Sequence, residues 1–403
     1  MAIDAGFGIF DCPGSTGIAA VTTALSFTPK AYLLWGVSVV DESAAVDHGS
    51  FMGMTDGTSE FAISMSATDG GTGDTRRDVD RAKVLVAING DDATHARDIE
   101  ATHSSFNANG FSVNFSTVTS GVKIHWLALG GSGLTSVSVG SALASALSVT
   151  GLGFQPDFLV AFSAGDDATP TADFDSYQMF GVADGTTEWW GAAWNGRDNS
   201  NSVDSQVDDG GFIGQHGNGF QHWESSLASF DADGFTWTGS DDDEFYYMAF
   251  ETGGSMSAAF TTKATGAAPA PQDLPDAGFV PGVYMLVSGS KVDHPPSTPN
   301  GCGWAMGVTD GSAMQHVFRT QVFNQRQADQ IQDDNHVLAV GKAHGAVADA
   351  IATVSAITDS TPTITWTTND SGADEIGVWY IETASPTTSF APVARRTSAL
   401  LAR

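Results

Sequence analysis

The pentapeptide Gly53-Met54-Thr55-Asp56-Gly57 recurs as Gly181-Val182-Ala183-Asp184-Gly185 and as Gly307-Val308-Thr309-Asp310-Gly311. The three copies begin 128 and then 126 residues apart. A second motif, Phe-x-Pro before an apolar run, begins at Phe27, Phe154 and Phe279, with spacings of 127 and 125. Because two independent motifs keep nearly the same period, the sequence predicts three tandem repeats.

Each repeat contains short segments in which apolar and polar residues alternate, as expected for strands with one buried face. One example is Phe235-Thr236-Trp237-Thr238, which follows the turn sequence Asp231-Ala232-Asp233-Gly234. Each repeat also closes on an apolar segment, at 124–129, 245–250 and 376–381. Short strands between Gly, Asp, Asn and Ser clusters predict an all-β fold of three tandem β-sandwich units, jelly-roll or Ig-like (immunoglobulin-like). One large continuous sandwich is the alternative.

The motifs place the repeats at residues 1–132, 133–254 and 255–385. Gly130-Gly131-Ser132-Gly133 predicts a flexible first link. The stretch 253–278 is rich in proline and poor in large apolar residues, so we expect a stiff, extended lead-in to the third unit.

Residues 386–403 form a C-terminal tail that has no acidic residue and carries Arg395, Arg396 and Arg403. Two interpretations of this tail are open. It is either a disordered end or a basic arm that docks on an acidic neighbour.

The composition is strongly acidic. The 403 residues include 16 basic and 47 acidic side chains, for a formal charge of −31. This charge argues against binding to nucleic acid and against docking on anionic lipid. There is no apolar run long enough for membrane insertion as a helix, and the first residues show no Sec signal pattern. Such a surface suits a protein soluble in strong salt, or one that is merely acidic.

The sequence contains few residues arranged for chemistry. We find no nucleophile elbow, P-loop, dinucleotide-binding glycine pattern or zincin helix, so we expect a non-enzyme without a cofactor. Cys12 and Cys302 lie far apart in the sequence, which predicts two free thiols. His216 and His222 are the closest notable histidine pair, and no further metal ligands accompany them.

Two acidic segments are candidates for calcium. Asp231 and Asp233 stand as in the opening of a calcium loop, although the Glu of a full EF-hand is absent. Asp241, Asp242 and Asp243 form the second candidate. The alternatives are a tight hairpin turn for the first segment and a solvated loop for the second.

The second repeat is dense in tryptophan, at Trp189, Trp190 and Trp194. Adjacent residues of a strand point to opposite faces, so we expect one of Trp189 and Trp190 to be exposed or to lie at a subunit contact. Exposed tryptophans could stack on sugar rings. The alternative is that these rings fill the core.

Taken together, the Phe-x-Pro motif, the Gly-x-x-Asp-Gly motif and the segment Ser229-Phe230-Asp231-Ala232-Asp233-Gly234-Phe235-Thr236-Trp237 resemble a known family. They are similar to repeat modules in virion structural proteins of tailed bacterial and archaeal viruses, found in fibres and decoration proteins. The resemblance covers about residues 5–385. The third repeat departs from the pattern, because Asp359-Ser360-Thr361-Pro362 replaces the Asp-Gly turn.

This resemblance implies a non-enzymatic structural component of the virion, as a capsid decoration or turret protein, a tail protein or a fibre. It implies contacts with other virion proteins and self-association as a homo-oligomer, with a trimer favoured because fibres are commonly trimeric. It implies no catalytic residues. The acidic composition would suit a virus of a high-salt habitat.

Two other classes of function compete with this interpretation. The first is a carbohydrate-binding adhesin that recognises a host-surface glycan through the aromatic residues of the second repeat. The second and weaker one is a secreted hydrolase, since carboxylate pairs could serve a glycosidase.

Overall fold

The computed structural model describes residues 2–22, 24–38, 48–67, 75–88, 96–164, 176–195, 203–217, 220–239, 243–289, 301–312, 314–322, 327–333, 335–340, 350–369 and 374–383. The described chain is almost entirely antiparallel β-structure, which confirms the all-β prediction. Within these residues, no helix has the length and apolar character needed to cross a membrane.

The first ten strands form two sheets, one with the strand order β1-β10-β3-β4-β5-β6 and one with the order β2-β9-β8-β7. Their bounds are β1 Asp4–Asp11, β2 Gly17–Thr22, β3 Pro29–Val37, β4 His48–Thr55, β5 Glu60–Ala67, β6 Thr75–Asp80, β7 Leu85–Ile88, β8 Arg97–Asn107, β9 Gly110–Thr117 and β10 Lys123–Gly130.

The next ten strands repeat this arrangement, in the orders β11-β20-β13-β14-β15-β16 and β12-β19-β18-β17. A short 3-10 helix, η1, lies between β11 and β12. The bounds are β11 Ser136–Leu143, η1 Ala144–Ala146, β12 Ser148–Thr150, β13 Phe158–Ser163, β14 Ser176–Ala183, β15 Glu188–Asn195, β16 Val203–Asp208, β17 Ile213–Gly217, β18 Phe220–Asp231, β19 Gly234–Thr238 and β20 Glu244–Glu251.

The last ten strands repeat the arrangement a second time, in the orders β21-β30-β23-β24-β25-β26 and β22-β29-β28-β27. We interpret each set of ten as one two-sheet sandwich and call them units 1, 2 and 3. The bounds in unit 3 are β21 Met256–Thr262, β22 Ala270–Asp273, β23 Val283–Gly289, β24 Gly301–Thr309, β25 Met314–Val322, β26 Gln327–Asp333, β27 Leu338–Val340, β28 Ala350–Ala356, β29 Thr363–Thr368 and β30 Glu375–Ile381.

Unit 3 differs from the sequence prediction at its start. The stretch 253–278 is not only a lead-in, because β21 pairs with β30 and β22 pairs with β29. Pro271 is accommodated in β22 because this strand lies at the edge of its sheet. The hairpin from β28 to β29 persists without the Asp-Gly turn, and Asp359 Oδ1 accepts the Thr361 N–H at 2.9 Å.

Each sandwich has its own apolar core between its two sheets. In unit 1, Tyr32 and Leu34 of β3 face Phe111 and Val113 of β9 in one cluster. The Tyr32 and Phe111 rings stack with their centroids 4.0 Å apart. Units 2 and 3 contain corresponding clusters. Each unit therefore buries apolar side chains between its two sheets, as a two-layer fold requires.

A fourth core lies where the three six-stranded sheets meet. Alternate residues of β3, such as Leu33 and Trp35, point away from the core of unit 1 and into this cluster. Val160 of β13 and Met285 of β23 enter it from units 2 and 3. We call this cluster the shared core. Its existence explains why these three strands are apolar on both faces.

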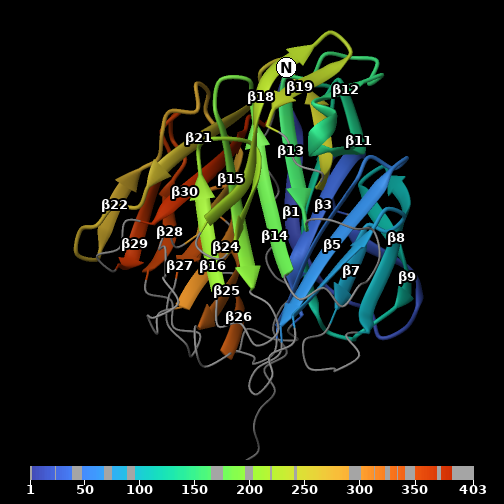
Figure 1. Cartoon of the computed structure of the whole chain (residues 1–403), viewed down its shortest axis with the longest axis horizontal. Coiled ribbons are helices and arrows are strands. Elements are labelled where there is room, and N and C mark those ends of the chain that lie inside the picture. Colours follow the sequence, from blue (N-terminus) through green and yellow to red (C-terminus); the bar gives the residue numbers. More distant parts are fainter. Residues whose placement is uncertain are drawn as a thin grey trace, which may run out of the picture.

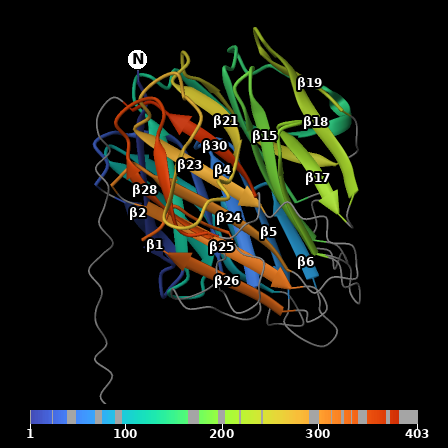
Figure 2. The same cartoon turned by 90° about the vertical axis from the view of Figure 1, so that its left-hand side faces the viewer.

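The units contact one another in a cyclic order. Strand β6 of unit 1 packs against β14 of unit 2, β16 against β24 of unit 3, and β26 against β4 of unit 1. The same head-to-tail contact therefore occurs at all three junctions and closes a ring, as in a cyclic trimer. Figures 1 and 2 show the three sets of strands side by side.

The first and last described segments also lie side by side. The Ile3 N–H donates to Glu382 O at 3.0 Å, and Ile3 forms a parallel β-bridge with Thr383. Units 3 and 1 thus meet here through backbone contacts between distant parts of the sequence. At the two corresponding junctions, residues 131–135 connect unit 1 to unit 2, and residues 252–255 connect unit 2 to unit 3.

Candidate functional site

The Gly-x-x-Asp-Gly motif forms the turn between β4 and β5 in unit 1. Asp56 Oδ1 accepts the N–H groups of Thr58 and Ser59, both at 2.8 Å. Gly57 has a φ of +84°, which favours glycine. A Cβ on Gly53 would lie 1.9 Å from Val84 O, so this strand passes close to the opposite sheet. These contacts make the motif a tight turn between two strands.

The same aspartates also join neighbouring units. Asp56 Oδ2 accepts the Val139 N–H of β11 at 2.9 Å, and Asp184 Oδ2 accepts the Ala258 N–H of β21 at 2.9 Å. In both cases the donor belongs to the first strand of the next unit. In units 1 and 2 the motif therefore serves the turn with one carboxylate oxygen and the contact between units with the other, which the sequence pattern did not indicate.

The first calcium candidate is a hairpin turn. Asp233 Oδ1 accepts the Gly153 N–H at 2.6 Å, and its Oδ2 accepts the Gly151 N–H at 3.0 Å. Asp231 Oδ1 accepts the Ser229 hydroxyl at 2.8 Å. These carboxylates bind their own chain, which favours the turn over a calcium loop. Among the residues that the structure describes, no group of three or more His, Cys, Asp or Glu is placed to hold a metal.

Several other predicted residues lie outside the described part of the chain. Asp241 and Asp242 do so, whereas Asp243 is buried and its carbonyl accepts the Ala144 N–H at 2.8 Å. The backbones of His216 and His222 belong to β17 and β18, but their side chains are outside the description, like the side chain of Cys302. Arg395, Arg396 and Arg403 lie entirely outside the described residues. Cys12 is a buried free thiol, as predicted.

Trp189 and Trp190 point to opposite faces of β15, as expected, yet both side chains are fully buried. Trp189 enters the shared core, where its Nε1 donates to Val378 O of unit 3 at 3.0 Å. Trp190 enters the core of unit 2, and its Nε1 donates to Glu224 Oε1 at 3.0 Å.

The interpretation of Trp189 and Trp190 as an exposed sugar-binding platform is therefore wrong, because no ring face of either residue is open to a ligand. We expected one of the pair to be exposed or to lie at a subunit contact. Instead, Trp189 is buried at a contact between two units of the same chain. Trp194 belongs to β15, and its side chain is outside the described residues.

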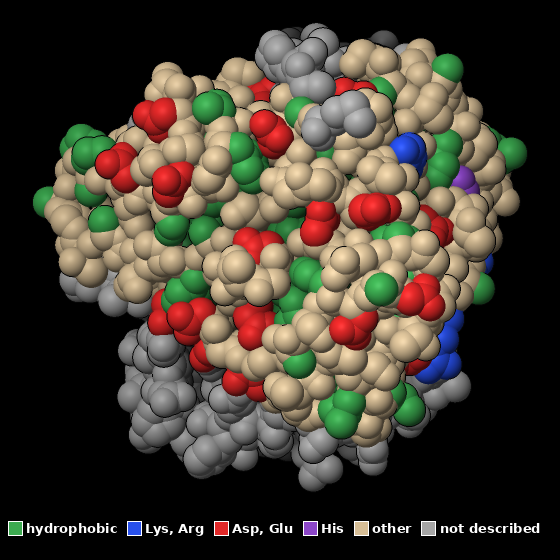
Figure 3. Space-filling view, turned by 90° about the horizontal axis from the view of Figure 1, so that it is seen from above, with side chains coloured by type: hydrophobic (Ala, Val, Ile, Leu, Met, Phe, Trp, Pro, Cys, Tyr) green, Lys and Arg blue, Asp and Glu red, His purple; other side chains and the backbone are tan. Residues whose placement is uncertain are grey.

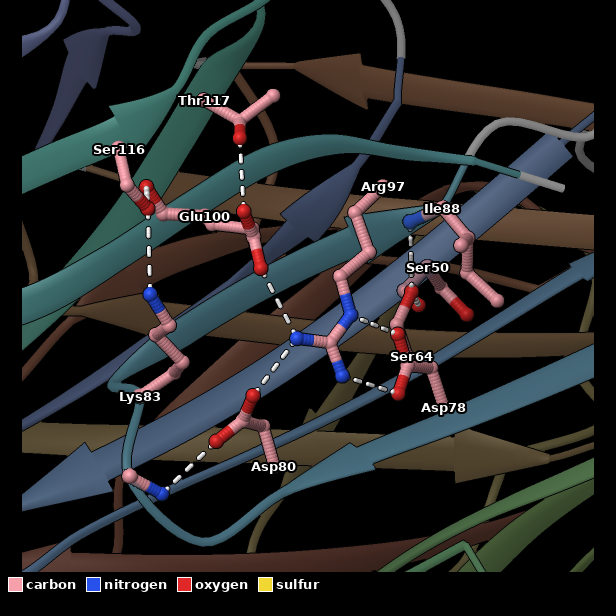
Figure 4. Close-up of polar contacts among 11 residues, drawn as sticks. Ser50, Ser64, Asp78, Asp80, Lys83, Ile88, Arg97, Glu100, Ser116 and Thr117 are labelled. Carbon is pink, nitrogen blue, oxygen red and sulfur yellow. Dashed lines mark hydrogen bonds and ion pairs between the residues drawn. The ribbon is translucent and has the colours of Figure 1, made fainter. Parts of the chain in front are cut away.

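Unit 1 contains a cluster of charges that no sequence motif revealed, which we call the Arg97 cluster (Figure 4). Arg97 of β8 forms two bonds with Asp78 of β6, from Nε at 2.5 Å and from Nη2 at 2.7 Å. Its Nη1 reaches Asp80 at 2.7 Å and Glu100 at 2.9 Å. The cluster thus ties the edge strand of one sheet to a strand of the other.

Burial and the charge of Arg97 shift the pKa values of Asp78 and Glu100 in opposite directions. Burial raises the pKa of Asp78, although Arg97 works to lower it. Burial also opposes the ionisation of Glu100, but hydrogen bonds from Thr117 and Arg97 outweigh it and lower the pKa. Gln221 takes the place of Arg97 in unit 2, judged from the register of the β18–β19 hairpin. The cluster is therefore a feature of unit 1, where it holds the edge strand β6 against β8.

A second feature that sequence reasoning missed is shared by units 1 and 2. Glu60 Oε2 accepts the His103 N–H at 2.5 Å, and Glu188 Oε2 accepts the Leu227 N–H at 2.7 Å. In both units the donor lies directly beside a register shift of the strand, where a β-bulge interrupts the ladder. Burial raises the pKa of both carboxyl groups, that of Glu188 to about 7.

Glu188 should therefore make stability depend on pH. Because its pKa is raised in the folded state, its contribution is fully present below the unfolded value near 4.5 and is lost as pH rises through about 7. Glu188→Gln keeps an oxygen acceptor for Leu227, so we expect a flatter profile of unfolding free energy between pH 5 and 8. At pH 8 the variant should be more stable by about 1 kcal/mol after allowance for solvent screening.

Urea titrations at several pH values measure this difference. Glu251→Gln, at a carboxylate that accepts the Ser136 hydroxyl at the edge of unit 2, is the matched control. Parallel pH profiles for the parent protein and Glu188→Gln would contradict the prediction.

The chain matches no known family model and no curated protein sequence. The fold and the contacts above thus define its class, an all-β protein of antiparallel sheets, which we interpret as three sandwich units packed around a shared core.

Proposed function

We propose that this protein is a non-enzymatic structural component of a tailed virus particle, acting through protein–protein contacts as a capsid decoration or turret protein, a tail protein or a fibre. The observation that carries the proposal is the cyclic packing of three similar sandwiches. Viral fibres, one of the classes that the repeats resemble, are commonly trimeric, and this chain has a trimer-like arrangement within one polypeptide.

The contacts of the polar residues support the same class of function, that of a structural protein. Asp56, Asp184 and Asp233 are the carboxylates with the clearest sequence motifs, and each accepts backbone N–H groups in turns or between units. These bonds fix the positions of strands. Trp189 and Trp190, which the adhesin alternative needs as exposed rings, serve as packing residues, so the structural role has more support than the glycan-binding role.

Purified particles test the proposal directly. Antibodies raised against the recombinant protein should label particles from a density gradient at regular positions, and the protein should co-migrate with them after washing in high salt. If the protein stays with the host-cell fraction and the washed particles lack it, the proposal fails. Binding to a glycan array instead would favour the adhesin.

We also propose that the protein self-associates and binds other virion proteins through its outer surface. The apolar sheet faces are already used in the shared core, and the outer face seen in Figure 3 carries many scattered carboxylates and few basic groups. With a formal charge of −31, copies repel one another at low ionic strength.

Salt should therefore control self-association. Light scattering behind size exclusion is expected to show a monomer at low salt and a defined homo-oligomer in multimolar salt, because salt screens repulsion between exposed charges. Potassium chloride and sodium chloride should act alike if screening is the cause. A monomer at both ionic strengths would contradict self-association, and the particle experiment would still test the structural role.

A further inference from the structure

The end of β21 in unit 3 places a lysine inside the protein. Lys263 follows this strand directly, and its side chain is fully buried. Its backbone N–H donates to Asp374 O at 2.7 Å, which fixes the position of the residue beside the start of β30. A buried ammonium group is costly unless other groups compensate for its lost hydration. The surroundings of this amine are therefore informative.

Two polar side chains from the segment between β29 and β30 lie next to the amine. Lys263 Nζ donates to Asn369 Oδ1 at 2.8 Å, and Asp374 Oδ2 lies 3.9 Å from Nζ. The Asp374 side chain is 1% exposed, and the Trp366 ring has its centroid 5.6 Å from Nζ. An amine, a carboxamide and a carboxyl group thus share one enclosed site with an aromatic wall.

Hydrogen bonds also fix the orientation of the amide. Asn369 Nδ2 donates to Ala264 O at 2.8 Å and to Gly266 O at 2.7 Å. The amide therefore presents its oxygen side to the lysine, while its nitrogen side faces a turn whose Gly266 is exposed. A group that leaves from Nδ2 has a short path to solvent.

The positions that correspond to Lys263 in units 1 and 2 are not charged. Cys12 and Ala144 donate their N–H groups to the partners that correspond to Asp374, namely Val122 and Asp243. Both Cys12 and Ala144 are buried. The sandwich therefore forms with a small residue at the position of Lys263, although unit 2 also has a buried aspartate, Asp243, at the place of Asp374. The fold itself does not require the buried lysine of unit 3.

The geometry points to an intramolecular isopeptide bond between Lys263 Nζ and Asn369 Cγ, formed by the chain itself. Asp374 takes one proton from the ammonium group, and the neutral amine attacks Cγ. Asp374 then relays an amine proton to Nδ2, the Cγ–Nδ2 bond breaks, and ammonia leaves. The proton that Asp374 first took is passed to the ammonia, which leaves as an ammonium ion. The exchange of one amide for another requires no oxidant, reductant or cofactor.

This bond would join the first strand of unit 3 to the segment before its last strand. The two residues are separated by 106 positions in the sequence, so the crosslink would close a long loop and restrict the unfolded chain. Unlike a disulfide, it would persist under reducing conditions. Such a bond suits a unit that carries load, whether or not the proposed virion role is correct.

Mass spectrometry of the denatured full chain tests the inference. The folded parent protein is expected to be lighter than its sequence mass by one ammonia molecule, and proteolysis should release a branched peptide that joins Lys263 to Asn369. Lys263→Met and Asp374→Asn should each have the full mass, whereas Lys123→Arg, at a partly exposed lysine on β10, should keep the loss. A full mass for the folded parent protein after days at neutral pH would overturn the inference.

A succinimide at Asn369 would also release ammonia, and the variants distinguish the two products. A succinimide would form in Lys263→Met and would hydrolyse in mild base, whereas the isopeptide requires the lysine and resists mild base. Ammonia loss that persists in Lys263→Met would overturn the crosslink. A crosslink that still forms in Asp374→Asn would overturn the proton transfer assigned to Asp374.

Discussion

Replacement of Trp189 by alanine is expected to lower the free energy of unfolding by about 3–5 kcal/mol, the usual cost of deleting a large buried aromatic side chain. The ring lies in the shared core, and its Nε1 donates to Val378 O across the contact between units 2 and 3. The variant loses apolar burial, leaves a cavity and leaves a carbonyl without its donor. Urea denaturation measures the loss.

A matched pair of variants shows whether the loss belongs to the contact between units. A Cβ on Gly377 of unit 3 would lie 2.3 Å from the Trp189 ring. Gly377→Ala should therefore destabilise the parent protein but have little effect, or a favourable one, in the Trp189→Ala background. This non-additivity is the signature of direct contact. Ile18→Ala, at a side chain that is 72% exposed, should change stability by less than about 0.5 kcal/mol.

Strictly additive effects of Trp189→Ala and Gly377→Ala would contradict the packing of unit 2 against unit 3. So would a loss for Trp189→Ala as small as that for Ile18→Ala.

Replacement of Arg97 by alanine is expected to cost about 3 kcal/mol at neutral pH, in the range found when one partner of a buried ion pair is removed. Asp78 is 1% exposed and would lose both of its bonds to the guanidinium group. Asp80 and Glu100 would remain nearby as like charges. The edge strand β6 would also lose its tie to β8.

The loss should depend on pH in a defined direction. Without Arg97, burial and repulsion from Asp80 and Glu100 raise the pKa of Asp78 without opposition, so protonation of Asp78 relieves the variant. We expect the difference between the parent protein and Arg97→Ala to be smaller at pH 4 than at pH 7, measured by urea denaturation. Lys123→Ala, whose partner Asp11 is 65% exposed, should cost at most about 1 kcal/mol. Equal losses for Arg97→Ala and Lys123→Ala would show that the cluster contributes little.

Much of the fold could be predicted because its signals are local. The Asp-Gly turns, the Phe-x-Pro entries to β3, β13 and β23, and the closing strands β10, β20 and β30 each lie within a few residues of sequence. The turn at Asp231 to Gly234 is a short-range signal of the same kind. Such patterns determine strands and hairpins without information from distant residues.

The contacts between units could not be predicted in the same way. Residues 31–37 are apolar almost throughout, which is a sign of burial on both faces that we did not use. That pattern shows that a second face is covered but not what covers it. The adjacent pair Trp189 and Trp190 raised the same question, and the answer depends on residues almost 190 positions away in β30.

The contacts at the candidate site were harder to predict from the sequence than the contacts between units. Asp56 has a local partner on one carboxylate oxygen and a partner in the next unit on the other, and only the first follows from the motif. Lys263, Asn369 and Asp374 stand in no recognisable pattern, because they meet only when β21 pairs with β30. Neither the Arg97 cluster nor Glu188 has a sequence signature, since each joins residues from separate strands.

The central claim is that three units close a ring around one shared core, and a circular permutant tests it most directly. In this permutant the chain begins at Ser132 and ends at Gly131, and a flexible linker of about eight residues joins Thr383 to Ala2. The contact of Ile3 with Glu382 and Thr383 brings the joined segments together. The linear chain from residue 2 to residue 383 is the control.

We expect the permutant to melt within about 5 °C of this control, because every contact between units is kept and only the position of the chain break moves. A permutant that aggregates or lacks a cooperative transition, while the control folds, would contradict the ring.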